Sequence, residues 1–199
     1  RGNWDHFYYG ISIGVALNPE VINSIKDGPN HLYQEEYTRA NRILDNLGNL
    51  AVDYIQRRGF QAHALTSTLS TQKNKLINLS TFLPHKTIAT RAGIGWIGKS
   101  ALLVTKEYGS AIRLTSVLTN MKLVPDNPIQ SSYCGECQEC VEYCPAKAIL
   151  GKNWYPGIER EKFYNAFKCR DLIRQLIKNN HMIQDLICGK CIVTCPWTK

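Results

Sequence analysis

Seven of the eight cysteines lie in two short runs near the end of the sequence. The first run reads Cys134-x2-Cys137-x2-Cys140-x3-Cys144-Pro145, a spacing typical of the ligands of [4Fe–4S] clusters. In such runs three thiolates bind one cluster, and the fourth binds a second cluster. The run therefore predicts a pair of clusters that share their ligand segments.

The second run, Cys188-x2-Cys191-x3-Cys195-Pro196, has one cysteine fewer. A lone cysteine upstream, Cys169, brings the total to eight. The simplest closed assignment gives each cluster four thiolates, with the cysteine before each proline crossing to the other cluster. The two sets are Cys134, Cys137, Cys140 with Cys195, and Cys169, Cys188, Cys191 with Cys144.

Two zinc sites are the alternative, because pairs of C-x2-C also bind zinc. Three cysteines within seven residues followed by Cys-Pro suit a cluster better than a tetrahedral zinc knuckle. Clustered cysteines in a reducing cytosol indicate metal more often than disulfides.

The segment RAGIGWIGKS, residues 91–100, matches two nucleotide-binding patterns, the P-loop and the dinucleotide fingerprint. Both patterns require an apolar strand before the glycines and a helix after them. Here KTIATRA precedes the glycines, a strand is expected to follow, and bulky Trp96 stands where a phosphate cradle needs bare backbone. The sequence therefore argues against both kinds of nucleotide site.

Charge is unevenly distributed along the chain, whose formal net charge is +8. Residues 54–106 contain no Asp or Glu but eight basic residues, which favours a phosphate-bearing cofactor or a nucleic acid as partner over a plain solvated face. The eight are Arg57, Arg58, Lys73, Lys75, Lys86, Arg91, Lys99 and Lys106.

The elements that must position these groups are an α/β layer. Strands are expected at 11–17, 60–66 and 111–118, and apolar residues recur with helical spacing over 33–58. Pro125-Asp126-Asn127-Pro128 is the expected boundary between domains at 1–125 and 126–199. With no long apolar run and no secretory leader, the sequence predicts a cytoplasmic protein without a membrane partner.

The chain resembles the epoxyqueuosine reductase family and, more distantly, reductive dehalogenases. The similarity rests on AGIGWIGKSALL, YGSAIRLTSVLT, CGECQECVEYCPAKAI, the lone Cys169 and CGKCIVTCPW, in that order. It implies a nitroreductase-like α/β domain that binds cobalamin or another corrinoid, and a small α+β ferredoxin-like domain with two [4Fe–4S] clusters. It also implies an electron donor of the ferredoxin or flavodoxin type.

In that family the glycine segment shapes the corrinoid pocket. The resemblance therefore assigns cofactor binding to Arg91, Gly93, Gly95, Trp96, Gly98, Lys99 and Ser100. Added volume at Gly95 or Gly98 would then block the cofactor and leave the iron–sulfur spectrum unchanged. The alternative is that the glycines only form turns, with Trp96 packed beneath them.

One departure from the family concerns the proton donor. The family uses an Asp about a dozen residues before the glycines, whereas the corresponding segment here, INLSTF at 77–82, has no carboxylate. His85 is the nearest group able to donate a proton near neutral pH, so it is the candidate catalytic residue, although a lone histidine is more often structural.

Three functions remain open from the sequence. The first is a corrinoid-dependent reductase with an altered substrate, and the second is an electron carrier or corrinoid-reducing protein without substrate chemistry. The third, a tRNA-contacting module, is not favoured. The missing Asp favours the second over the first, and the glycine segment argues against a plain ferredoxin.

Overall fold

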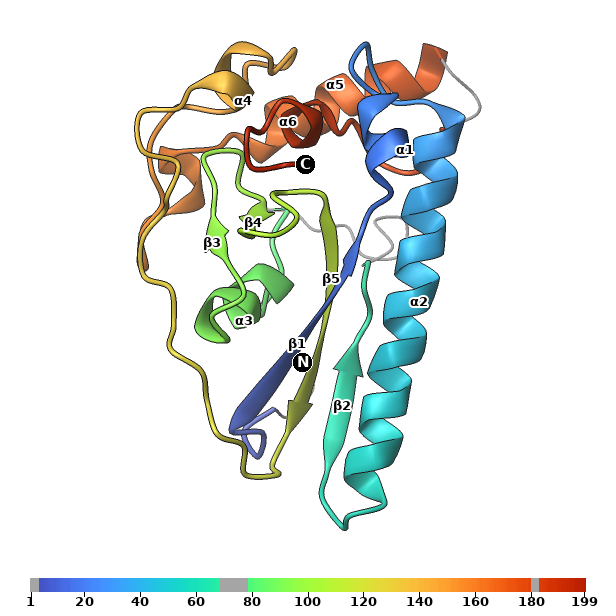
Figure 1. Cartoon of the computed structure of the whole chain (residues 1–199), viewed down its shortest axis with the longest axis vertical. Helices are drawn as coiled ribbons and strands as arrows, with labels where there is room; N and C mark the ends of the chain where they lie inside the picture. The colour runs from blue at the N-terminus through green and yellow to red at the C-terminus, as the bar shows by residue number, and fades with distance from the viewer. Residues whose placement is uncertain (1–3, 69–78, 180–182) are drawn as a thin grey trace.

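The computed structural model describes residues 4–68, 79–179 and 183–199. Its central feature is a three-stranded sheet in the order β1, β5, β2 (Figure 1). β1 spans Tyr9–Ala16, β2 spans Ala62–Leu65 and β5 spans Ile112–Thr119. β5 pairs antiparallel with both neighbours, so β1 and β2 run parallel to each other on either side of it.

All three predicted strands are confirmed, with ends displaced by one or two residues. Their order is a finding of the structure, because β1 and β2 do not pair directly. The strand that comes last in the sequence inserts between them, which gives a split β–α–β unit.

The predicted helix is confirmed as α2, His31–Gln56, which runs along the sheet (Figure 1). Its N-cap is Asn30, whose side chain accepts a hydrogen bond from Tyr33 N at 3.0 Å. Gly59, in the left-handed conformation with φ of +82°, follows its last turn. The buried face of α2 contacts all three strands, as its amphipathic spacing requires.

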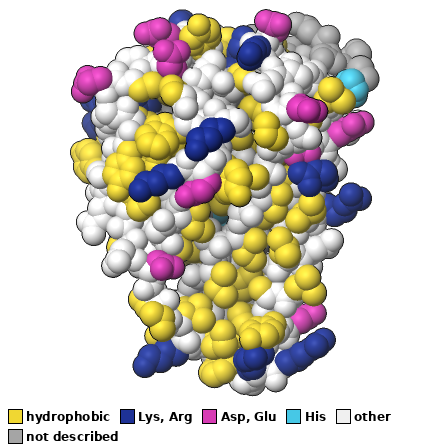
Figure 2. All heavy atoms as spheres, viewed as in Figure 1, with side chains coloured by type: hydrophobic (Ala, Val, Ile, Leu, Met, Phe, Trp, Pro, Cys, Tyr) yellow, Lys and Arg dark blue, Asp and Glu magenta, His cyan; other side chains and the backbone are white. Residues whose placement is uncertain are grey.

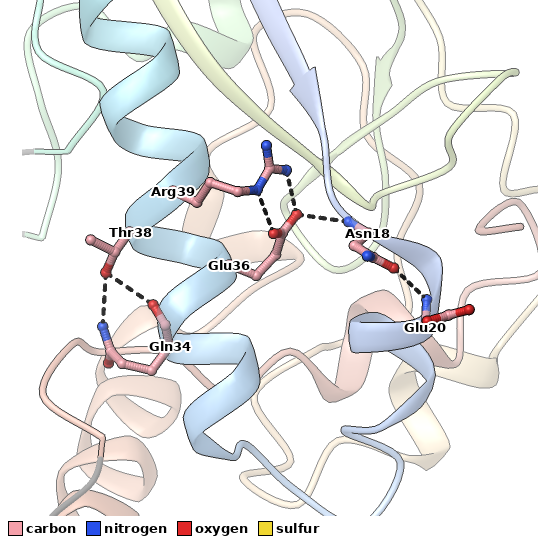
Figure 3. A network of polar contacts seen from close by, with 6 residues as sticks. All are labelled: Asn18, Glu20, Gln34, Glu36, Thr38 and Arg39. Carbon is pink, nitrogen blue, oxygen red and sulfur yellow. Dashed lines mark hydrogen bonds and ion pairs between the residues drawn. The ribbon is translucent and has the colours of Figure 1, made fainter.

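A polar network fastens the end of β1 to α2 (Figure 3). Arg39 donates two hydrogen bonds of 2.6 Å to the carboxylate of Glu36, which also accepts from Asn18 N at 2.8 Å. Asn18 in turn caps α1, Pro19–Asn23, by accepting from Glu20 N. The bonds from Arg39 lower the pKa of Glu36, against the opposing effect of burial.

The opposite face of the sheet is covered by α3, His85–Arg91. Alternation along β5 decides which side chains meet each helix, since successive residues of a strand point to opposite faces. Arg113 bonds to Asn41 of α2, whereas Ser116 bonds to His85 of α3. The sheet therefore lies between two helices, and the α/β layer predicted from the sequence has helices on both sides.

A short hairpin follows α3 and carries the glycine segment. β3, Trp96–Ile97, pairs antiparallel with β4, Leu103–Val104. The glycines thus follow a helix and precede a strand, which is the reverse of both nucleotide-binding patterns. The rejection of a P-loop and of a dinucleotide site agrees with this order of elements.

The C-terminal part contains α4, Glu139–Glu142, the 3-10 helix η1, Arg160–Lys162, α5, Ala166–Asn179, and α6, Lys190–Val193. These helices lie at one end of the molecule (Figure 1). One hydrophobic cluster joins Ile183, Ile187 and Ile192 to Tyr33 and Tyr37 of α2. The two parts are thus joined by one hydrophobic cluster. The domain boundary at 125/126 stays a prediction.

Large apolar side chains remain exposed on the surface. Figure 2 shows hydrophobic side chains running down the lower half of one face, with Lys, Arg, Asp and Glu scattered around them. None of the helices in the described ranges is both long and apolar enough to cross a membrane.

Candidate functional site

A hollow between α4, α6 and the β3–β4 hairpin collects the cysteines of the first predicted set. Its wall contains Cys134, Cys137, Cys140 and Cys195, together with Cys191 of the second set. Cys140 lies on α4 and Cys195 follows α6, and these two helices are in contact. The structure therefore brings together four cysteines that come from both runs.

The electrostatics of this hollow oppose four free thiolates. Burial, with a smaller contribution from the neighbouring thiols of Cys134, Cys195 and Cys137, raises the pKa of Cys140 to about 12. Only a strong positive charge among them would keep all four deprotonated, as bound iron does. The donor set thus fits a [4Fe–4S] cluster.

The second predicted set is also brought together. Burial raises the pKa of Cys191, with further increases from Cys169, Cys188, Cys140 and Cys144. Cys169 lies on α5, and its thiol is hydrogen-bonded to the side chain of Tyr164. Cys144 is buried and its Sγ accepts from Ala148 N at 3.4 Å. Cys191 and Cys140 influence each other, so the two sets are neighbours.

The cysteines line a hollow and do not converge on the position of a single ion. In the described ranges no three His, Cys, Asp or Glu side chains converge closely enough to hold one metal ion. Gly98 is part of the wall of the hollow, and a Cβ there would lie 3.5 Å from Cys134 Sγ and 2.8 Å from a methyl of Val104. The room between the thiols suits a cluster of iron and sulfide.

The glycine segment faces this hollow. Gly98, Lys99 and Ser100 are on its wall, and the buried Lys99 donates from Nζ to the carbonyl oxygen of Cys137 at 2.9 Å. Trp96 is fully buried between Tyr133 and Trp197, at ring distances of 4.8 and 4.9 Å. The segment connects the iron–sulfur part to the α/β part.

The described residues of the glycine segment divide between the wall of the hollow and the packed interior. Arg91 is exposed, and neither it nor Gly93, Gly95 or Trp96 is on the wall of the hollow. Gly95 is needed for close packing, because a Cβ there would collide with the carbonyl oxygen of Val104. Close packing at Gly95 and the burial of Trp96 show one structural use of this segment, and its assignment to a corrinoid pocket stays a prediction.

A larger cavity of about 380 Å³ lies between α3, β4 and β5. Its titratable residues are His85, Lys86 and Arg113, and no carboxylate is on the described wall. The remaining lining residues are hydroxyl-bearing or apolar: Leu65, Thr66, Ser67, Thr81, Leu83, Pro84, Ala101, Leu102, Leu103, Ile112 and Leu114. Of the predicted site residues only His85 lies here.

Both ring nitrogens of His85 are engaged. Nε2 lies 2.9 Å from the carbonyl oxygen of Thr66, and Nδ1 lies 3.0 Å from Ser116 Oγ. A carbonyl only accepts, so Nε2 carries the proton and Nδ1 accepts from the serine hydroxyl. Burial lowers the pKa of His85, the Thr66 carbonyl raises it, and Arg113 and Asp45 act in opposite directions. The imidazole is neutral at pH 7, and its one N–H is already bonded.

Two residues near this cavity had no predicted role. Lys86 turns its Nζ inward onto the carbonyl oxygen of Ala101, at 2.7 Å, and burial, with a smaller contribution from Arg160, lowers its pKa to about 8. Asp45 of α2 accepts from Ser67 N and is the carboxylate that influences His85. No local pattern distinguishes Lys86 from an exposed lysine, and Asp45 lies 40 positions before His85 in the sequence.

The eight basic residues of 54–106 do not form one basic face. Lys86 and Lys99 point inward, whereas Arg57, Arg58, Arg91 and Lys106 are exposed. Lys73 and Lys75 lie outside the described residues.

Comparison with known proteins agrees with the cysteine chemistry. Residues 133–198 match the family model of a 4Fe-4S double cluster binding domain. The chain is 37% identical over 121 residues to an epoxyqueuosine reductase of Atelocyanobacterium thalassa, covering 59% of this chain and 38% of that protein. It is 33% identical over 124 residues to the tetrachloroethene reductive dehalogenase of Sulfurospirillum multivorans, covering 56% and 23% respectively. The matches thus span well under half of these relatives.

Solved structures show a similar fold. The catabolic reductive dehalogenase NpRdhA, in complex with 3-bromo-4-hydroxybenzoic acid, matches with a TM-score of 0.73 and 17% identity, over 96% of this chain and 25% of its own. An epoxyqueuosine reductase with a modified tRNA stem loop matches with a TM-score of 0.57 and 21% identity, over 94% and 48%. At these identities the likeness concerns the fold alone.

Proposed function

We propose that this chain, an iron–sulfur protein related to epoxyqueuosine reductases and reductive dehalogenases, passes electrons through two [4Fe–4S] clusters to an acceptor at its larger cavity. The observation that carries the proposal is the convergence of cysteines from both runs on one hollow, with the remaining cysteines close beside it. When bound, such clusters supply one-electron transfer at low potential. Electrons would enter from a ferredoxin- or flavodoxin-type donor, in the reducing cytoplasm.

The ligand assignment follows the crossed pattern. Cys134, Cys137 and Cys140 with Cys195 hold what we call the first cluster, and Cys169, Cys188 and Cys191 with Cys144 hold the second. The mutual effects of these thiols on their pKa values support this division. The proximity of Cys140 and Cys191 supports electron transfer between the two clusters.

A corrinoid is the acceptor we propose, since one of the structurally similar proteins is described as carrying out B12-dependent dehalogenation. A corrinoid with its nucleotide tail is larger than the drug-sized ligands that occupy pockets of about 300 to 1,000 Å³. The cavity of about 380 Å³ would therefore enclose only part of a corrinoid, and the rest of the cofactor would lie outside this cavity. The chain's own contribution is a largely apolar wall that also includes His85, Lys86 and Arg113.

Electron transfer without substrate chemistry is the second candidate function. It is favoured by His85, whose only N–H is held by Thr66, and by a described cavity wall without a carboxylate. A substrate other than epoxyqueuosine would also be consistent with this wall. Recognition of tRNA has less support, because basic side chains on the face in Figure 2 are scattered among hydrophobic and acidic ones.

The test is anaerobic reconstitution of the full chain followed by iron and sulfide analysis. The proposal requires about eight of each per chain, with the visible and electron paramagnetic resonance spectra of two clusters. Cys169→Ser should remove the second cluster and leave about four iron atoms, and Cys134→Ser should remove the first. Zinc in place of iron, or no loss in either variant, would overturn the assignment.

The acceptor is tested with the same reconstituted protein. Reduced chain is mixed with cob(II)alamin, and cobalt reduction is followed spectroscopically with Lys86→Met as the cavity variant and exposed Lys152→Met as its control. We expect reduction by the wild type and by the control. Intact clusters without any reduction of the corrinoid would leave the electron-carrier function as the better assignment.

A further inference from the structure

Lys99 is a buried cation directed at the first cluster's ligands. The residue is only 2% exposed and lies on the wall of the hollow with Cys134, Cys137, Cys140 and Cys195. Its Nζ donates to the backbone of one of these ligand residues, Cys137. Within the described ranges it forms no ion pair with a carboxylate. A buried ammonium is costly unless an anion compensates it, and the thiolates are the anions at hand.

The hairpin fixes the backbone that carries this lysine. Gly98 N donates to Leu102 O and Ala101 N donates to Gly98 O, both at 2.9 Å, which makes a tight turn between β3 and β4. Gly98 allows the turn to approach the ligand segment, because a Cβ there would lie 2.8 Å from a methyl of Val104 and in contact with Cys134 Sγ. The hydrogen bonds of the turn and the close packing at Gly98 therefore fix the backbone of Lys99 beside the hollow.

The second set of cysteines has different surroundings. The cation near it is Lys190, which lowers the pKa of Cys188 but is half-exposed and therefore screened by water. Two uncharged hydroxyls are also near this set, that of Tyr164, which is hydrogen-bonded to Cys169, and that of Tyr33, close to Cys191. Among the residues that the structure describes, a buried positive charge thus distinguishes the first site from the second.

We propose that Lys99 raises the reduction potential of the first cluster above that of the second, so that an electron entering the chain comes to rest on the first cluster. The inference rests on the proposed cluster assignment. Reduction adds one negative charge, and a fixed cation in a low-dielectric site stabilises the reduced form more than the oxidised form. One electron from a ferredoxin- or flavodoxin-type donor would come to rest on the cluster held by Cys134, Cys137, Cys140 and Cys195, which would leave the second cluster oxidised. No proton or bond is exchanged.

Potentiometric titration of the reconstituted full chain tests the role of Lys99. Lys99→Gln keeps a hydrogen-bond donor but removes the charge, and Lys99→Arg keeps the charge. We expect Lys99→Gln to shift the first cluster toward its oxidised form by about tenfold, or about 59 mV for one electron, and Lys99→Arg to restore the potential. The exposed Lys152→Gln, the same change of charge at the surface, should leave both potentials unchanged. Two unchanged potentials in Lys99→Gln with full iron content would overturn the inference.

A second measurement needs no Lys99 variant to fold. Cys169→Ser and Cys134→Ser provide reference spectra of the first and second cluster alone, and wild-type chain is then reduced with less than one electron per molecule. The inference requires the spectrum of the first cluster, and the spectrum of the second would refute it. Wild-type chain that holds no pair of clusters would instead refute the proposed function, so the two failures are distinguishable.

Discussion

The cysteine hollow and the larger cavity are lined in contrasting ways. Most of the hollow is formed by cysteines that are closely spaced in the sequence, whereas the cavity is lined by short segments of ordinary residue types from several separate elements. Cys134, Cys137 and Cys140 lie within seven residues, but Thr66, His85 and Ser116 meet only because β2, α3 and β5 pack together. A metal centre of this kind is therefore visible in sequence, and a cavity built across a sheet is not.

Loss of the clusters should have the largest effect on the molecule. Bound metal can contribute on the order of 10 kcal/mol to the folding of a small domain. After anaerobic chelation of iron, we expect amide hydrogen exchange in α5 and α6 to become much faster, with α2 and β5 still protected. Equal protection of α5 and α6 before and after chelation would show that hydrophobic packing, for example of Ile183 and Ile192, is sufficient.

Reduction of epoxyqueuosine should be inefficient because the described cavity wall has no carboxylate and the N–H of His85 is already hydrogen-bonded to Thr66. A positioned proton donor typically contributes 10²- to 10⁴-fold, or about 3 to 5 kcal/mol. We expect reduced chain to form little queuosine from modified tRNA under anaerobic conditions. Formation at ordinary enzymatic rates would contradict this expectation, and its loss in His85→Ala but not in Asp45→Asn would identify the histidine as the donor.

Lys86 should make stability depend on pH in the alkaline range. Its pKa falls from 10.5 to about 8 on folding, so between these values the unfolded chain binds more protons and the free energy of unfolding rises with pH. The full rise is up to about 3 kcal/mol, and below about pH 8 the penalty of burying the charge is fully present. Denaturation at pH 7.5 and pH 10 should show this rise in wild type and in Lys106→Met, and its loss in Lys86→Met.

Gly98→Ala should disturb the first cluster, in contrast to the effect on a corrinoid expected from the sequence. The added Cβ meets Val104 at 2.8 Å and Cys134 Sγ at 3.5 Å, and overpacking of this kind costs about 1 to 3 kcal/mol. The control is Gly14→Ala, whose Cβ would meet the flexible end of Ile112. Chemical denaturation and the visible spectrum distinguish the two variants. An unchanged cluster spectrum in Gly98→Ala would favour the corrinoid interpretation of the glycines.

Regular elements were predictable where periodicity is strong. The helix expected at 33–58 is α2, His31–Gln56, and the three strands lie within two residues of their expected ends. The antiparallel placement of β5 between β1 and β2 had no local signal, since alternation shows that a strand exists and not which neighbour it pairs with.

The sequence by itself determined the chemistry of the cysteines, because ligand number and spacing are properties of a short stretch of chain. It also indicated that the glycine segment must approach another group closely. Only the tertiary structure decided that this group includes Cys134 and Val104, that Lys86 and Lys99 point inward, and that Asp45 lies near His85. These outcomes depend on packing between elements far apart in the sequence, where burial and electrostatic environment are set by neighbours that no local pattern specifies.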